Sequence, residues 1–241
     1  IEKVKATPDE LKGGGGLDGV RLEHFRAYMQ THTYIFIPTG DLWPASSVNA
    51  RLGRVPVLAP SGEPQFDEKG KALTQSASTW LDQNRPVEQM TWAPGMPQVI
   101  EDRLVSDGGW RDQEGCRIYN QYRPPTLVEG DPALAQPWLD HVSRVFHEDA
   151  DHIIRWLAHR VQRPAEKINH ALVLGGAQGI GKDTIFEPVK AAVGPWNFAE
   201  VSPQNMLGRF NGYTKSVVLR VSEARDLGDV DRFAFYDHMK T

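Results

Sequence analysis

The sequence contains a single cysteine, Cys116, in 241 residues. One cysteine excludes an internal disulfide and any zinc site built from several cysteines. No run approaches the roughly 18 consecutive apolar residues that a membrane-spanning helix needs, and the N-terminal residues lack the apolar segment of a signal peptide. We therefore expect a cytoplasmic protein that has no membrane partner.

Excess positive charge is also lacking, because the formal net charge is -4 at pH 7. Contacts to nucleic acid would have to come from local basic patches, or from a ring that concentrates loops from several subunits. The hydrophobic content of 40% is sufficient for a sizeable core, in one large domain or two smaller ones.

Glycine and proline indicate how the chain is organised. Four consecutive glycines predict a flexible N-terminal segment or an added linker over residues 1–16. Residues 17–130 are rich in proline and glycine and predict an accessory α+β region. Its expected elements are helices over residues 18–29 and 72–84, and strands over residues 34–38 and 116–122.

Residues 131–168 form a predicted helical segment with two amphipathic helices, over residues 131–146 and 147–163. In the second helix Ile153, Leu157 and Val161 recur every four residues and predict one buried stripe. Pro164 is expected to end this helix.

From residue 169 the pattern becomes α/β. NHALVLGG, residues 169–176, predicts a short apolar strand, the loop GGAQGIGKDT follows, and a helix is expected from Asp183 onward. The spacing Gly-x4-Gly-Lys in this order is that of a phosphate-binding loop. Glycines let successive N–H groups turn toward one anion, and Lys182 supplies a charge to the β- and γ-phosphates. The expected nucleotide-binding residues are Gly176, Ala177, Gln178, Gly179, Ile180, Gly181, Lys182, Asp183 and Thr184.

A second motif follows in KSVVLRVSEARD, where the apolar run over residues 217–221 predicts a buried strand. Ser222 and Glu223 come at its carboxyl end, where open α/β sheets place their ligands. A carboxylate there can hold magnesium through water or orient the attacking water. The alternative for the first motif is a glycine-rich turn that packs closely without a ligand.

These strings resemble the ATPase module of phage and prophage primase-helicases, which is similar to the superfamily-three helicases of the AAA+ class. GGAQGIGKDT, LGRFNGYTKSVVLRVSEARD and FYDHMKT carry the resemblance, and IPTGDLWPASSVNARL, TWAPGMPQVI and YNQYRPP resemble the preceding region of the same family. The resemblance implies an α/β P-loop NTPase core over residues 169–241, preceded by a helical segment and a smaller α+β region. No match is found for the family's sensor and arginine elements, so the core is expected to be incomplete at its C-terminus.

The resemblance also implies ATP and Mg²⁺ as cofactors, with Lys182 and Glu223 as the catalytic residues. Asp183 stands where the usual loop has Ser or Thr, and therefore Asp183, Thr184 and Glu223 are the candidate magnesium ligands. Ser222 stands where many such ATPases have a second acidic residue, so turnover is expected to be slow or to depend on a group from a neighbouring subunit.

The expected function is an ATP-dependent DNA helicase module of a replication protein. Its implied partners are single-stranded or forked DNA, further subunits in a ring, expected to be a hexamer, and primase or other replisome proteins in the bacterial host cytoplasm. The alternatives are a nucleotide-binding assembly protein without unwinding activity, and a phosphotransferase that acts on a small molecule.

Basic side chains in the second predicted helix are a candidate nucleic-acid patch, because cations neutralise phosphates and an aromatic ring stacks on bases. The patch comprises Arg155, Arg160 and Arg163 beside Trp156. The alternative is a solvated basic face. The histidines of this region lack metal-ligand spacing and are expected to be solvated or hydrogen-bonded.

Overall fold

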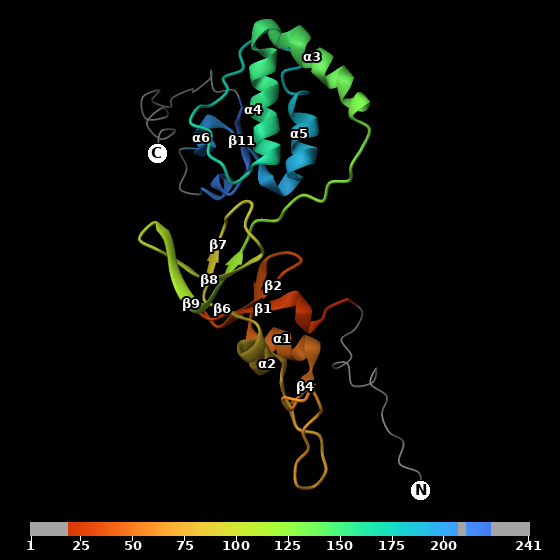
Figure 1. Ribbon diagram of the computed structural model, residues 1–241, viewed down its shortest axis with the longest axis vertical. Coiled ribbons are helices and arrows are strands. Elements are labelled where there is room, and N and C mark those ends of the chain that lie inside the picture. Colours follow the sequence, from red (N-terminus) through yellow and green to blue (C-terminus); the bar gives the residue numbers. More distant parts are fainter. Residues whose placement is uncertain (1–18, 207–210, 223–241) are drawn as a thin grey trace. The chain divides into compact units, whose positions relative to one another are not determined.

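The computed structural model describes residues 19–206 and 211–222. The chain divides into two compact units. The first unit consists of residues 1–91 and 97–121, and the second consists of residues 92–96 and 122–241. Each unit is a mixture of helices and small sheets, so the fold is of the mixed α/β kind (Figure 1). The four segments that the sequence predicts, with boundaries at residues 16, 130 and 168, stay a prediction.

A four-stranded sheet forms the centre of the first unit, in the order β3-β2-β1-β6. Strands β1 (Phe25–Tyr28), β2 (Thr33–Phe36) and β3 (Asp41–Trp43) pair antiparallel, and β6 (Pro86–Val87) pairs parallel to β1. The predicted strand over residues 34–38 is confirmed by β2.

The helix predicted over residues 18–29 is wrong. The structure has a short 3-10 helix, η1 (Leu22–His24), followed directly by β1. Phe25 and Ala27 are buried while Arg26 and Tyr28 are only half-buried, which is the period-two alternation of a strand. Pairing with β2 satisfies the backbone groups, and this tertiary contact overrides the local helical pattern.

Two helices, α1 (Ala45–Leu52) and α2 (Ala77–Asn84), pack against this sheet with a shared core. Ser76 caps α2, because its hydroxyl accepts the Thr79 N–H. Helix α2 is therefore shorter than the helix predicted over residues 72–84, whose first part forms β5 (Thr74–Ser76). The most buried core side chains include Phe25, Tyr34, Val48 and Leu81.

The remaining strands of the first unit form two small sheets. Strand β4 (Arg54–Pro56) pairs with β5, and the long loop of residues 57–73 connects them. A second sheet has the order β7-β9-β8, from β7 (Gln89–Thr91), β8 (Val99–Ser106) and β9 (Gly109–Asn120). Strand β9 confirms the strand predicted around residues 116–122.

The second unit begins with helices around one core. The 3-10 turn η2 (Pro132–Ala135) precedes α3 (Gln136–Phe146), and η3 (His147–Asp149) leads into α4 (Ala150–Gln162). Both predicted helices are therefore confirmed. Ile153 and Leu157 are buried, and Val161 packs partly buried against the same cluster, so the predicted stripe faces the core.

A parallel pair of strands completes the second unit, from β10 (Phe198–Val201) and β11 (Val218–Val221). Between α4 and β11 lie α5 (Phe186–Val193), η4 (Pro195–Asn197), α6 (Pro203–Met206) and η5 (Gly212–Thr214). In Figure 1, α4 and α5 run side by side. Strand β11 confirms the apolar strand predicted before Ser222.

The strand predicted over residues 169–176 is not formed, because this segment has no ladder partner among the described residues. Leu172 and Leu174 still pack against the core cluster, while Val173 is 91% exposed. The alternation of a strand is therefore present without the interstrand hydrogen bonds that define one.

Within the described ranges, no helix has both the length and the apolar character needed to cross a bilayer.

Tyr34 provides a test of the first unit. Its hydroxyl donates to Asp82 Oδ1 over 2.9 Å, and burial, followed by the hydrogen bond and the charge of Asp82, raises its pKa from 10.0 to about 12. Between these two values Tyr34 stays protonated when folded but ionises when unfolded, so this stabilisation is present below pH 10 and disappears as the pH rises through 12. The pKa shift corresponds to a loss of about 2 to 3 kcal/mol in the free energy of unfolding over this pH range.

We therefore expect Tyr34→Phe to destabilise the protein clearly at pH 8 and much less at pH 11.5. Urea unfolding of both proteins at each pH measures this difference. If the difference in unfolding free energy between the wild type and Tyr34→Phe were the same at both pH values, the raised pKa would be contradicted.

Candidate nucleotide-binding site

The loop of residues 175–184, here called the glycine loop, contains three glycines in conformations that other residues rarely adopt. The φ angles are 148° at Gly176, 81° at Gly179 and 88° at Gly181. A Cβ atom on Gly176 would lie 2.6 Å from Ile180 Cδ1. These glycines are therefore required by the backbone path of the loop.

The N–H groups of the glycine loop are candidate hydrogen-bond donors to an anion. In the part of the chain that the structure describes, no N–H of residues 177–184 donates a hydrogen bond to another protein group. Residues 175–180 are exposed to solvent. Consecutive N–H groups in an exposed glycine-rich turn are suited to bind an anion such as a phosphate.

Lys182 is bent back over this loop. Its ammonium group donates to the carbonyl of Gly176 over 3.0 Å and to that of Ala177 over 2.7 Å. The ammonium thus lies at the start of the loop, on the same short segment as the uncommitted N–H groups. A bound phosphate would gain both a point charge and N–H donors there.

Helix α3 holds the end of the glycine loop in place. His141 Nε2 lies 3.0 Å from the Gly181 carbonyl, and Trp138 Nε1 donates to the Ile185 carbonyl over 3.1 Å. Since a carbonyl only accepts, His141 must carry a proton on Nε2. These two side chains are one turn apart on α3, so one helix face fixes the backbone on both sides of Lys182 and Thr184.

Asp183 is committed to an ion pair with Arg220, which comes from β11. Arg220 also lies 3.5 Å from Glu200 on β10, and its guanidinium stacks over the Phe186 ring at 5.4 Å. Arg220 is the residue before the last of β11. The glycine loop therefore ends beside the carboxyl ends of the two parallel strands, where open α/β sheets bind ligands.

Ser222 directly follows β11 at this same edge. Its N–H donates to the Val201 carbonyl over 3.0 Å, and its hydroxyl donates to Glu200 Oε1 over 2.6 Å. Glu223, the predicted acidic residue of the second motif, lies outside the described residues. Its role in catalysis and metal binding stays a prediction.

The two remaining candidate magnesium ligands differ in what they contact. The Asp183 carboxylate already binds Arg220, whereas the exposed Thr184 hydroxyl has no hydrogen-bond partner among the described residues. A hydroxyl at this point of a phosphate loop is a suitable oxygen ligand for a hard cation. The residues present therefore fit magnesium through Thr184 more readily than through Asp183.

The predicted nucleic-acid patch on α4 has its donors engaged inside the chain. Arg160 donates to the carbonyls of Val217, at 3.1 and 2.9 Å, of Pro164, at 3.3 Å, and of Glu166. Burial lowers the pKa of Arg160. Two further ion pairs on this surface are Arg155 with Asp151 at 3.0 Å and Arg163 with Glu166 at 3.0 Å.

The histidines of the second unit also contact other groups of the chain. His152 Nε2 and His170 Nε2 lie 3.1 Å apart, and the Trp156 indole donates to the His170 carbonyl over 3.3 Å. His159 lies 3.4 Å from Glu166. Among the described residues, no group of three or more histidine, cysteine or acidic side chains is placed to share a metal ion.

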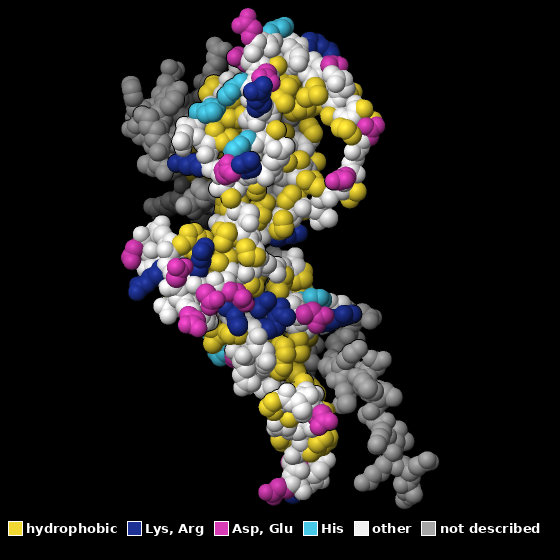
Figure 2. Space-filling view, viewed as in Figure 1, with side chains coloured by type: hydrophobic (Ala, Val, Ile, Leu, Met, Phe, Trp, Pro, Cys, Tyr) yellow, Lys and Arg dark blue, Asp and Glu magenta, His cyan; other side chains and the backbone are white. Residues whose placement is uncertain are grey.

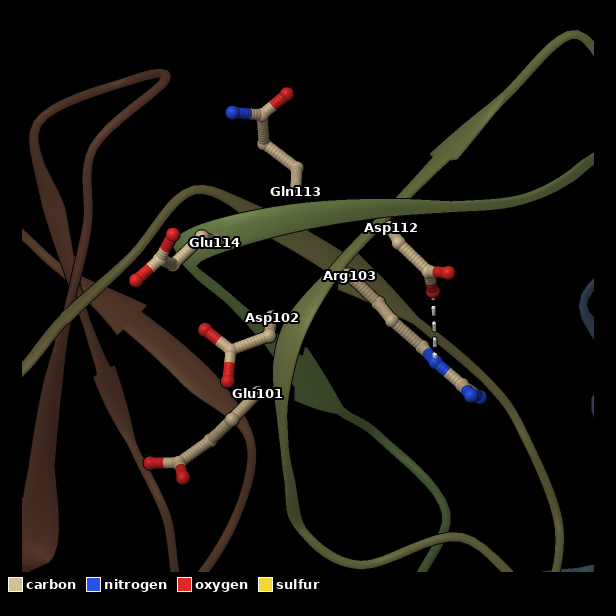
Figure 3. A pocket seen from close by; sticks show the side chains of 6 residues that line it. All are labelled: Glu101, Asp102, Arg103, Asp112, Gln113 and Glu114. Carbon is tan, nitrogen blue, oxygen red and sulfur yellow. Dashed lines mark ion pairs between the residues drawn. The ribbon is translucent and has the colours of Figure 1, made fainter.

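An open hollow on the β8–β9 hairpin is acidic but does not form a reaction centre. Figure 3 shows that its side chains diverge, with Gln113 pointing away from Glu101 and Asp102. Asp112 pairs with Arg103 at 3.5 Å, and Asp102 accepts the Gly115 N–H over 2.8 Å at a bulge in the strand. These contacts explain the acidic residues as parts of the hairpin.

The described residues on the face that Figure 2 shows carry charges of both signs. On the face that Figure 2 shows, Lys and Arg side chains are mixed with Asp and Glu side chains. This mixture agrees with the net charge of -4. Binding of a polyanion would therefore depend on local groups.

Sequence reasoning missed the groups that hold the glycine loop from outside. Trp138 is 47 residues and His141 is 40 residues before its partner, and Arg220 is 37 residues after Asp183. No spacing rule links such distant positions. The only available signal was the position of Arg220 near the end of a predicted buried strand.

Comparison with known proteins supports the fold. No family model matches the chain, and no curated protein matches it. A solved structure described as the A form of the apo C-terminal region (CTR) of NrS-1 is similar, with a TM-score of 0.53 and 16% identity. The match covers 90% of this chain and 46% of that chain, so this chain spans about half the length of its match. Such a likeness shows a shared mixed α/β fold.

The contact between α3 and the glycine loop leads to a test. A Cβ on Gly181 would lie 2.5 Å from His141 Cε1, at a φ angle of 88°. We expect Gly181→Ala to destabilise the protein by more than about 1 kcal/mol, because it adds a steric clash to backbone strain. In a His141→Ala background only the strain remains, so the same substitution should cost less.

Urea unfolding of the wild type, both single variants and the double variant measures this coupling as a double-mutant cycle. Equal costs of Gly181→Ala in both backgrounds would show that His141 does not constrain the loop.

Proposed function

We propose that the chain is an ATP-dependent DNA helicase module of a replication protein of the phage primase-helicase type. The observation that carries the proposal is the glycine loop. Its residues 175–180 are exposed, its N–H groups from residue 177 to residue 184 have no acceptor among the described residues, and Lys182 lies on the same turn. The similarity of the fold to the NrS-1 C-terminal region and the resemblance of the motifs to phage primase-helicases support it.

In this proposal residues 176–181 surround the phosphates, and Lys182 leaves its loop carbonyls to bind the β- and γ-phosphates. Thr184 would hold Mg²⁺, whose charge would offset the negative charge that develops on the phosphates. Asp183 instead acts through its ion pair with Arg220, which positions the loop at the carboxyl ends of β10 and β11. Glu223 is proposed to orient the attacking water.

DNA and further subunits are the proposed partners. The mixed surface charge means that one subunit offers few cations to DNA. A ring, proposed to be a hexamer, would allow each subunit to supply one or two cations to single-stranded or forked DNA. Arg155 and Arg163 remain candidates for such contacts. Each would have to give up an exposed ion pair, and such a pair contributes little to stability. Arg160 is the weakest candidate, because four hydrogen bonds to carbonyls hold it.

A second candidate is a nucleotide-binding assembly protein of a replisome, in which ATP orders the oligomer without unwinding. Ser222 favours this candidate, because its hydroxyl is bound to Glu200 at the position where many ATPases have an acidic residue. A site with one acid less would bind ATP more effectively than it hydrolyses ATP.

Binding of a fluorescent ATP analogue, with and without Mg²⁺, tests the nucleotide site. We expect Lys182→Ala to weaken binding about 10-fold or more, because a charge-assisted contact to phosphate is lost. Lys190→Ala is the matched control, since Lys190 is an exposed lysine on α5. Thr184→Val should remove the magnesium dependence, and Asp183→Asn should retain it.

If Asp183→Asn alone removes the magnesium dependence, the carboxylate is the metal ligand. If every variant binds like the wild type, the glycine loop has only a packing role and the proposal fails.

Hydrolysis in the presence of DNA separates the two candidate functions. For a helicase module we expect single-stranded DNA to stimulate ATP hydrolysis several-fold, and Lys182→Ala to abolish the stimulated rate. Phosphate release measures turnover, and sedimentation with and without ATP measures assembly. Assembly that depends on ATP, without turnover at any DNA concentration, would instead select the assembly protein.

A further inference from the structure

Two arginines of the first unit are neighbours on adjacent strands. Arg26 is the second residue of β1, and Arg85 directly precedes β6. Strands β1 and β6 pair in parallel with Ala27 opposite Pro86, and the Ala27 N–H donates to the Arg85 carbonyl over 2.9 Å. The backbone therefore holds the two arginines at one level of the sheet.

Arg26 faces away from the helices of the first unit. Its neighbours Phe25 and Ala27 are buried in the core shared with α1 and α2, so the alternation of β1 directs Arg26 to the opposite face. Ile35 is its partner across β2 and belongs to a second cluster on that face, with Val87 and Tyr119. Arg26 thus borders an apolar patch, and Arg85 precedes Val87 of the same patch by two residues.

Both arginines are half-buried, and each has a buried Nε atom without an acceptor among the described residues. No ion pair or side-chain hydrogen bond joins either of them to another described residue. Burial is the main cause that lowers the pKa of both side chains, and the charges of Arg85 and Arg117 lower that of Arg26 further. Glu101 and Tyr119 near Arg26, and Glu23 near Arg85, offset this only in part.

Other arginines of this protein show what a satisfied guanidinium looks like. Arg160, buried to a comparable degree, donates to three different carbonyls, and Arg117 has Glu101 at 3.8 Å. A buried charge without such partners costs free energy, and two like charges side by side add repulsion. An oxyanion between them would remove both costs.

We propose that Arg26 and Arg85 form a binding site for a phosphate group, either in the backbone of a single-stranded nucleic acid or in free phosphate. The planar guanidinium fork matches the oxygens of a phosphate and binds it with paired hydrogen bonds. The site belongs to the first unit, and it stands independently of nucleotide binding at the glycine loop of the second unit.

The first test is thermal unfolding at increasing phosphate concentration, with ionic strength held constant by sodium chloride. The full chain carries Lys182→Ala in every sample, so that the glycine loop contributes no phosphate binding. The Lys182→Ala protein is the parent, and we compare it with the same protein that also carries Arg26→Met, Arg85→Met or the control Arg111→Met. Arg111 is an exposed arginine of the β8–β9 hairpin, so its replacement removes the same charge elsewhere in the unit.

We expect phosphate to raise the Tm of the parent and of the Arg111 variant, and the apparent affinity to fall about 10-fold or more in the other two. Without phosphate, Arg26→Met and Arg85→Met should be at least as stable as the parent, because they remove unpaired buried charge. Arg85→Lys keeps the charge but loses the fork, so it should restore only part of the response. A parent without a phosphate response, or variants less stable in phosphate-free buffer, would overturn the proposal.

Fluorescence anisotropy with a labelled single-stranded oligonucleotide distinguishes the two sources of phosphate. If the nucleic-acid backbone is the source, each Met variant weakens binding and lowers the slope of log affinity against log salt by about 1, while Arg111→Met has less effect. If oligonucleotide binding is equal in all variants while the Tm response is lost, the ligand is free phosphate. Equal behaviour in both measurements would contradict the site.

Discussion

The guanidinium of Arg160 binds three backbone carbonyls, and this set of hydrogen bonds joins the parts of the second unit that surround the glycine loop. The carbonyls belong to Pro164 and Glu166, which follow α4, and to Val217, which precedes β11. One side chain thus fixes the end of the long helix relative to the strand. Because β11 carries Arg220, and Arg220 holds Asp183, the position of the loop depends indirectly on the same bonds.

The helices and the last strand of this unit could be predicted because their patterns are local. Ile153 and Leu157 recur at helical spacing, and the run from Val217 to Val221 is apolar except for Arg220. The failures have a shared physical cause, since strands depend on partners that the local sequence does not name. Residues 25–28 are helical in pattern but pair with β2, whereas residues 169–176 alternate like a strand and have no partner among the described residues.

The candidate site follows the same division. The need for glycines in this loop could be predicted from spacing, because the positive φ angles are a local property of Gly176, Gly179 and Gly181. The engagement of Asp183, one of the candidate metal ligands, could not be predicted, because its partner is an arginine 37 residues away. Likewise, nothing in the sequence separates Arg160, which has acceptors, from Arg26, which lacks them among the described residues.

The chain also alternates between its two units in an unusual order. Residues 92–96 belong to the second unit, although residues 97–121 return to the first. Trp92 packs edge to face on Tyr122, with ring centres 6.1 Å apart, and joins the core of the second unit. During synthesis Trp92 is translated before β8 and β9, and the core against which it packs is translated after them. A single cut of the polypeptide after residue 121 would therefore leave the second unit without Trp92 and the rest of residues 92–96.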